Sequence, residues 1–298
     1  ALDSGTISRH AQRGGVVMRR SFSIARVFSW QTFSQLFLLL GVAIMILPFL
    51  YMVGTSFKPP SEVISWPPTL WPEKPTLENY ATLRTAAPFG RFFLNSLIVS
   101  LASTLGIITT STLAGYIFSK FRFPGRTILF ILLLSTAMVP FETYLIPLYL
   151  IAKNLRLLNT YAGLVGPYLI MSFGIFLMRQ YMETIPSSVI ESAKIDGANE
   201  WQIYWRLIFP LSMTVITMVF LLSFLFHWSN FLWHLVVNTP ESNKLTLPIG
   251  LALFRGQYTS YWAKMMAASC FSILPIAIIF IVAQKFFIEG LTAGAVKE

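Results

Sequence analysis

The sequence predicts an all-α integral membrane protein with six transmembrane helices and both termini in the cytoplasm. Of its 298 residues, 55% are hydrophobic and only 11% are charged, whereas a soluble domain carries about 25% charged residues. The mean hydropathy is +0.66. This composition excludes an ordinary water-soluble globule, a disordered chain and a disulfide-stapled module, because so apolar a chain requires hydrocarbon around it.

Six apolar stretches are long enough to cross a bilayer core, which takes about 20 helical residues. They lie at Gln35–Phe57, Phe92–Phe118, Thr127–Ala152, Tyr161–Met182, Ile208–Val237 and Met265–Ile288. The first is too long for the apolar core of a signal peptide, so we expect a retained helix. The second is rich in Ser, Thr and Gly, which favours close helix packing.

Positive charge predicts the orientation of these spans. The tail of residues 1–32 contains five Arg, and the short link 119–126 contains Lys120, Arg122 and Arg126. Cytoplasmic loops collect Lys and Arg, so both termini and the polar segment at 183–207 are expected on the cytoplasmic side of the inner membrane. This pattern also explains the formal net charge of +10, and we expect no nucleic-acid partner.

The first external loop, residues 58–91, is rich in proline. Proline fixes φ and removes a hydrogen-bond donor, so a stiff, irregular segment is expected. Its role is open between a simple connector and a docking surface for an external partner.

Residues 185–210 are too polar to span a membrane and predict a helix–turn–helix on the cytoplasmic face. The start and stop signals are a capping box between Ser188 and Glu191, an Asp196-Gly197 turn, a cap at Asn199 and Pro210 in the first turns of the next span. Trp201, Tyr204, Trp205 and Ile208 share one face of the second helix. That face could rest on lipid headgroups, or the whole segment could fit a groove on a soluble partner.

The order Glu191-Ser192-Ala193, Asp196-Gly197-Ala198 and Leu207-Ile208-Phe209-Pro210 resembles the "EAA" loop of ABC importer permeases. Three positions depart from that pattern, each by a small or volume-tolerant change: Ser192, Leu207 and Phe209. Further stretches resemble carbohydrate-type permeases, and the likeness runs from about residue 33 to the C-terminus. They lie at 121–125, 138–140, 146–149, 157–164, 176–179 and 289–297.

This resemblance implies a type I ABC importer permease fold. It also implies three kinds of protein partner besides membrane lipid and substrate: a homologous second permease subunit, two ATP-binding cassette ATPase subunits and an external substrate-binding protein. By resemblance, the residues that couple to the ATPases are Glu191, Ala193, Asp196, Gly197, Ala198 and Pro210.

The chain lacks catalytic equipment of its own. No Gly-Lys pair occurs, so there is no phosphate-binding Walker A loop, and we expect partner ATPases to bind ATP and Mg. The three histidines, His10, His227 and His234, have no Cys or carboxylate cluster beside them in the sequence, so no metal site and no cofactor on this chain are expected.

Five polar or aromatic residues are candidates for the substrate path. Glu142 lies within the third span, where a carboxylate must face water or protein. The others, His227, Trp228, Asn230 and Trp233, combine aromatic faces with hydrogen-bonding groups, as sugar sites do. Ordinary packing or an interfacial aromatic belt explains them equally well.

The function expected is therefore that of a permease subunit in an ATP-driven sugar importer. A glycerol-3-phosphate or other polyol-phosphate importer is the alternative, followed by a secondary transporter. A membrane-embedded enzyme is disfavoured, because the spans contain no paired acids and no nucleophile cluster.

Overall fold

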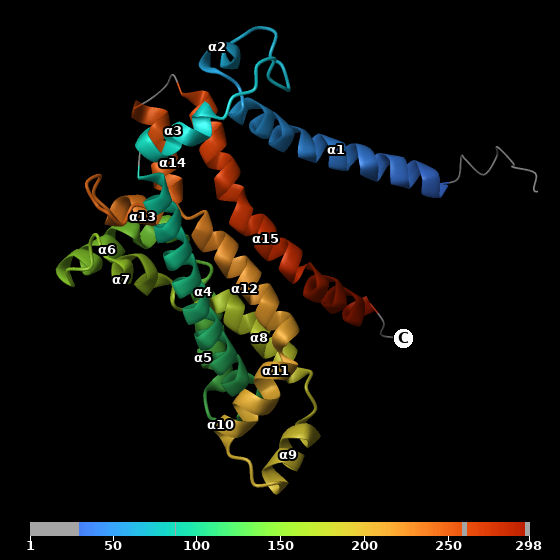
Figure 1. Cartoon of the computed structure of the whole chain (residues 1–298). Helices are drawn as coiled ribbons and strands as arrows, with labels where there is room; N and C mark the ends of the chain where they lie inside the picture. Colours follow the sequence, from blue (N-terminus) through green and yellow to red (C-terminus); the bar gives the residue numbers. More distant parts are fainter. Residues whose placement is uncertain (1–29, 87, 258–260, 296–298) are drawn as a thin grey trace, which may run out of the picture. The chain divides into compact units, whose positions relative to one another are not determined.

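The computed structural model describes residues 30–86, 88–257 and 261–295, and these residues form helices and connecting turns without strands. The helices are α1(Trp30–Ser56), α2(Pro60–Val63), α3(Glu78–Ala86), α4(Phe89–Lys120), α5(Arg126–Thr136), α6(Phe141–Asn154), α7(Tyr161–Val165), η2(Gly166–Tyr168), α8(Ser172–Glu183), α9(Ser187–Ile195), α10(Glu200–Ile203), η3(Tyr204–Ile208), α11(Phe209–Leu211), α12(Met213–Trp228), α13(Leu232–Val237), α14(Leu247–Gln257) and α15(Trp262–Ala295) (Figure 1). Most of the tail expected at 1–32 lies outside the described residues.

The chain divides into two units, one ending at Phe49 and the other beginning at Leu50. The described part of the first unit is most of α1, an apolar helix of 27 residues. Three helices, at Thr32–Ser56, Phe89–Lys120 and Trp262–Lys285, are long and apolar enough to cross a membrane, and three bent helix pairs raise the possible number to six.

The bent pairs correct the expectation of single helices at Thr127–Ala152, Tyr161–Met182 and Ile208–Val237. The bends are 93° between α5 and α6, 47° between the α7–η2 turn and α8, and 75° between the helical run ending at Leu211 and α12. Pro140 explains the first break, because a proline disfavours helical geometry in the residue before it. A π-helical turn, η3, and then Pro210 precede the third break; both disturb the i to i−4 ladder.

The 58–91 segment is less irregular than expected. It contains α2 and α3, and the carboxylate of Glu62 accepts backbone N–H bonds from Glu73 and Lys74 at 3.0 and 3.2 Å. The Lys58 ammonium is buried and donates to the carbonyl of Thr69. The prolines therefore belong to a folded segment that hydrogen bonds of its own side chains to its own backbone stabilise.

Helix α4 is central to the second unit and packs against α8 and α12 (Figure 1). Two glycines permit the close approach of α4 and α8. A Cβ at Gly115 would lie 2.6 Å from Cβ of Met178, and one at Gly174 would lie 2.6 Å from Oγ of Ser111. The small residues of the second span thus serve helix packing, as expected.

Candidate functional site

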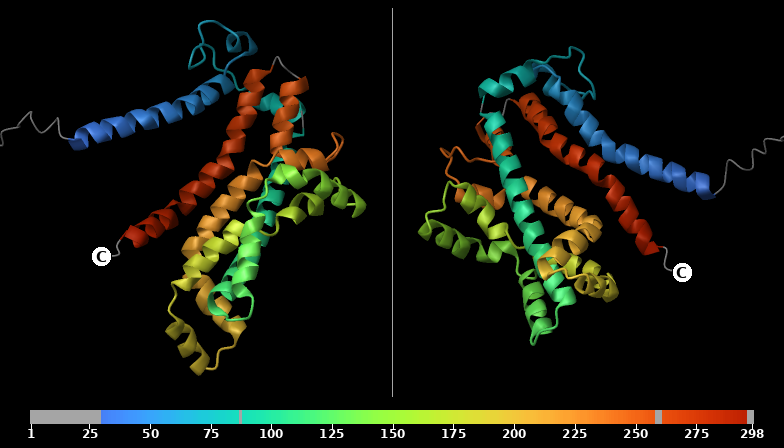
Figure 2. Two further views of the ribbon diagram at one scale, coloured as in Figure 1. Left: turned by 180° about the vertical axis from the view of Figure 1, so that it is seen from behind. Right: turned by 60° about the horizontal axis from the view of Figure 1, so that its bottom comes forward.

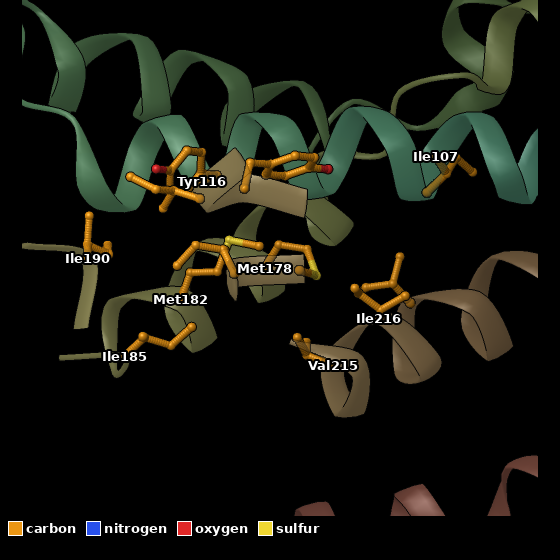
Figure 3. Close-up of a cluster of buried hydrophobic side chains, with 12 residues drawn as sticks. Ile107, Tyr116, Met178, Met182, Ile185, Ile190, Val215 and Ile216 are labelled. Atoms are coloured by element: carbon orange, nitrogen blue, oxygen red, sulfur yellow. The ribbon is translucent and has the colours of Figure 1, made fainter. Parts of the chain in front are cut away.

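The 185–210 segment contains the expected helix–turn–helix, and both views of Figure 2 show it at one end of the α4, α8 and α12 bundle. Its apolar side chains join the core between those helices. Figure 3 shows Ile185 and Ile190 facing the same cluster as Tyr116 of α4 and Met182 of α8. The segment is therefore anchored to the bundle.

Gly197 closes α9 with a Schellman motif. Its φ is +82°, which glycine adopts without the penalty of a Cβ. The N–H of Gly197 donates to the carbonyl of Lys194, and the N–H of Ala198 donates to that of Ala193, both at 3.0 Å. Ala193 and Ala198 also pack against the same buried cluster. Asp196 is the C-cap residue and is exposed.

The cap expected at Asn199 is present as a full capping box. Asn199 Oδ1 accepts from the N–H of Gln202, and Gln202 Oε1 accepts from the N–H of Asn199, both at 2.9 Å. The capping box expected between Ser188 and Glu191 is not formed. The N-cap of helix α9 is Pro186, two residues before the expected Ser188; its φ of −60° suits a helix start, and no side chain caps the helix.

Three hydrogen bonds join the segment to the end of α4. Tyr116 donates through its hydroxyl to Glu200 Oε2 at 2.8 Å, and the hydroxyls of Thr112 and Tyr204 lie 2.6 Å apart. The Lys120 ammonium donates to the carbonyl of Ile185 at 2.6 Å. Movement of the segment must therefore pull on α4 or break these bonds.

Glu200 is shared between two partners. Its Oε1 forms an ion pair with Lys194 of α9 at 2.7 Å, and its Oε2 accepts from Tyr116. The Lys194 ammonium holds the pKa of the Glu200 carboxyl below its ordinary value, partial burial opposes this, and the Tyr116 hydrogen bond adds to the lowering. The carboxylate thereby links α9, α10 and α4.

The apolar face expected from Trp201, Tyr204, Trp205 and Ile208 is divided by the structure. Tyr204 and Ile208 are buried, whereas Trp201 and Trp205 are 63% and 51% exposed. The π-helical turn that begins at Tyr204 rotates the side chains away from simple α periodicity. Together with Ile195, which is 87% exposed, the two tryptophans form an apolar surface that the described residues leave uncovered. Glu191 and Pro210 are also exposed.

Two of the path candidates are packed inside the bundle. Trp228 is 2% exposed, and its Nε1 donates to the carbonyl of Ser272 at 3.0 Å. Trp233 is fully buried, and its Nε1 donates to the carbonyl of Gly163 at 3.0 Å. Both indole N–H groups are satisfied, so in this conformation these residues stabilise helix contacts.

The remaining path candidates lie in different surroundings. Asn230 stands between α12 and α13 and donates from Nδ2 to the hydroxyl of Tyr168 at 2.9 Å. His227 is 2% exposed, and neither ring nitrogen has a hydrogen-bond partner among the described residues. Glu142 is exposed, in the first turn of α6, where a carboxylate interacts favourably with the helix dipole.

A cavity of about 540 Å³ lies where the α5–α6 and α7–α8 breaks meet α4 and α12. His227 lines it and Glu142 does not. Its other polar and aromatic residues were not among the candidates expected from the sequence. Its lining comprises Ile107, Thr136, Ala137, Val139, Phe141, Tyr144, Pro167, Tyr168, Ile170, Met171, Ser172, Phe173, Ser223, Phe226 and His227. A Pro or Gly that breaks an apolar run, as at Pro140 and Gly166-Pro167, was the available signal.

The described residues contain no group of three or more His, Cys, Asp or Glu that could hold a metal ion. Cys270 is a free thiol, half-buried.

The chain shares its fold with a chain of a known transporter. A bacterial ABC transporter involved in the import of the acidic polysaccharide alginate contains a chain that superposes with a TM-score of 0.77 at 24% identity, over 89% of this chain and 99% of that one. This likeness defines the class of fold, that of a chain of an ABC transporter.

The chain belongs to the family of binding-protein-dependent transport system inner membrane components, whose model matches residues 102–289. It is 33% identical over 270 residues to the sn-glycerol-3-phosphate transport system permease protein UgpE of Escherichia coli O1:K1 / APEC, covering 88% of this chain and 96% of the relative. It is equally similar, 33% over 279 residues, to the arabinooligosaccharides transport system permease protein AraQ of Bacillus subtilis (strain 168), covering 93% and 97%. The chain is thus an inner-membrane permease subunit.

Proposed function

We propose that this chain is one permease subunit of an ATP-driven importer for a carbohydrate. The partners are a homologous second permease subunit, two ATP-binding cassette ATPases that bind ATP and Mg, and an external binding protein. The observation that carries the proposal is the 185–210 segment, which is anchored to α4 and exposes Ile195, Trp201 and Trp205. Exposed apolar surface on a folded, capped element is typical of a protein interface.

Six spans agree with this function. Three are single helices and three lie within the bent pairs, the third of which enters the membrane after the 185–210 segment; this leaves both termini on the side of the basic link 119–126. On this arrangement the 185–210 segment faces the cytoplasm, where ATP is available. The expected coupling residues divide into two groups there. Glu191 and Asp196 lie on the exposed surface, whereas Ala193 and Ala198 pack inward and Gly197 sets the turn.

The contacts give a route for mechanical coupling. Closure of the ATPases displaces α9 and α10 as one piece, because Gly197, Asn199 and the Lys194–Glu200 ion pair fix them to each other. The Tyr116–Glu200 and Thr112–Tyr204 hydrogen bonds pass that displacement to α4. Since α4 packs on both α8 and α12, its movement repositions the helices around the cavity.

Two substrate classes follow from the relatives. AraQ is named for arabinooligosaccharides and UgpE for sn-glycerol 3-phosphate, at the same identity. We favour a sugar and keep a polyol phosphate as the second candidate.

Reconstitution tests the proposal. The chain is co-purified with its partners, placed in proteoliposomes with the binding protein, and assayed for uptake of labelled neutral trisaccharides and sn-glycerol 3-phosphate with and without ATP. We expect ATPase subunits in the purified complex and uptake that stops without ATP. A complex that brings no ATPase, with uptake that persists in the absence of ATP, would refute the function.

A further inference from the structure

The cavity at the two helix breaks combines features of a ligand site. Its volume of about 540 Å³ falls in the usual range of small-molecule pockets, about 300–1,000 Å³. Non-helical backbone at membrane depth is tolerated only where it is buried in protein or lines a water-filled cavity. Here the α5–α6 break and the α7–α8 break both contribute to the same lining.

His227 has hydrogen-bonding capacity that the described residues leave unused. Its ring is 2% exposed, and both Nδ1 and Nε2 are without a hydrogen-bond partner among those residues. Buried polar groups are nearly always paired in native proteins, so a cavity-lining histidine with both nitrogens unpaired among the described residues has capacity for a partner that they do not supply. The ring is held edge-on against Tyr168, with 4.9 Å between ring centroids, so its orientation is fixed.

Hydroxyl groups and aromatic rings also line the cavity. The Tyr168 hydroxyl accepts from Asn230, which leaves its own proton available to a ligand. The hydroxyls of Thr136 and Ser172 lie 2.8 Å apart, and together they retain acceptor lone pairs. Phe141 stacks on Tyr168 with 5.9 Å between ring centroids. Aromatic faces bind the C–H surface of a sugar ring, and hydroxyl and imidazole groups bind its hydroxyls.

The charge of the wall selects the ligand class. Across the described part of the chain, every residue lining the cavity is uncharged at neutral pH when its histidine is neutral. A phosphate ester brings one or two negative charges, and burying them at membrane depth requires Arg, Lys or a metal. A neutral carbohydrate needs none of these.

We propose that this cavity binds a neutral carbohydrate in transit, with His227 and the Tyr168 hydroxyl as its hydrogen-bonding partners. The inference rests on the proposed importer function and selects between its two substrate classes.

The variant His227→Phe tests the site, because the two possible roles of His227 predict opposite results. Replacing an unpaired buried imidazole by an apolar ring of similar size removes a polar group that has no partner, so the thermal stability of the assembled transporter should stay the same or rise. Uptake of the transported neutral trisaccharide should fall on the order of tenfold, as expected for one lost hydrogen bond. ATPase assembly and binding-protein docking should be unchanged.

His234→Phe is the matched control. His234 is also buried and does not line the cavity; its Nδ1 contacts Thr246 Oγ1 at 3.2 Å, and only its Nε2 is without a partner among the described residues. This variant should lower stability and leave uptake per folded complex unchanged. Tyr168→Phe, which removes a single oxygen, should lower uptake in the same direction as His227→Phe.

The probes are arabinotriose, maltotriose, cellotriose and sn-glycerol 3-phosphate, each in proteoliposomes with the complete transporter. ATP-dependent uptake of a trisaccharide that His227→Phe impairs supports the site. ATP-dependent uptake restricted to sn-glycerol 3-phosphate, or trisaccharide uptake that His227→Phe leaves unchanged, would overturn this inference while the importer function stands. Absence of ATP-dependent uptake for all four would count against both.

Discussion

The 185–210 segment and the cavity depart from the usual solvent preferences in opposite ways. The segment, although it is polar, exposes Ile195, Trp201 and Trp205. The cavity, although apolar helices surround it, is lined by His227, whose ring nitrogens have no hydrogen-bond partner in the described part of the chain. Each departure costs stability in the isolated chain. Function is expected where such rules are broken, because a partner or ligand supplies the missing contact.

The largest effect should come from Trp228→Ala, next to His227 on α12. Trp228 packs on Phe224 with 5.7 Å between ring centroids and is 2% exposed. Its truncation should cost about 3–5 kcal/mol of folding stability, measured as a fall in the thermal unfolding temperature of the purified complex. Adjacent residues would then have separate roles, with Trp228 in packing and His227 in the cavity. Unchanged stability together with altered uptake kinetics would instead indicate that Trp228 lines the substrate path.

Gly197→Pro should be next in size. Proline cannot adopt a φ of +82° and lacks the N–H that bonds to Lys194, so the Schellman motif is lost at a cost of roughly 2–4 kcal/mol, local to the segment. We expect the spans to remain folded and ATPase docking to fail in a pull-down. Gly125→Ala is the control, since Gly125 also has a positive φ of +80° but lies outside the segment. If both variants dock the ATPase equally well, the turn at Gly197 is not required for ATPase docking.

Tyr116→Phe should have a smaller effect. It removes the hydroxyl that donates to Glu200 and should cost about 1 kcal/mol or less, because the Glu200 side chain is 43% exposed. ATP hydrolysis and assembly should persist, while solute transported per ATP falls. Glu200→Gln and the double variant, measured in the same assay, complete a double-mutant cycle. Additive losses would show that the two side chains are not coupled.

The pH dependence of the segment should be the smallest effect. The pKa of Glu200 is lowered chiefly by Lys194, so its stabilising contribution is complete above the ordinary value of 4.5 and disappears as the pH falls through the lower folded value. Hydrogen exchange of residues 187–203 should therefore be equally protected at pH 7 and pH 6 and less protected near pH 4. Glu200→Gln should remove that difference in protection. If the pH profile of this variant is unaltered, a group other than Glu200 causes the pH dependence.

The same comparison shows how far the sequence could go. The 185–210 segment follows local rules, so Asp196-Gly197 and Asn199 predicted its turn and cap correctly. Ser188 failed as a cap because Pro186 already fixes the helix start, and the Trp201 face failed because η3 changes the helical period. Two of the helix breaks carry a local signal, at Pro140 and Gly166-Pro167, but that signal does not give the angle of the bend. A hydropathy profile gives the length of an apolar stretch but does not locate a bend within it. The sequence therefore could not predict that Tyr144 and Tyr168 line the same cavity.

Cross-linking from Ile195 tests the central claim most directly. Ile195 is the most exposed apolar residue of the segment, at 87%. An Ile195→Cys variant in a Cys270→Ala background is treated, in the assembled transporter in native membranes, with a short thiol-to-amine cross-linker. The account predicts one main adduct, between this chain and an ATPase subunit, whose yield changes with ATP. Labelling by lipid-soluble reagents with no ATPase adduct would contradict it.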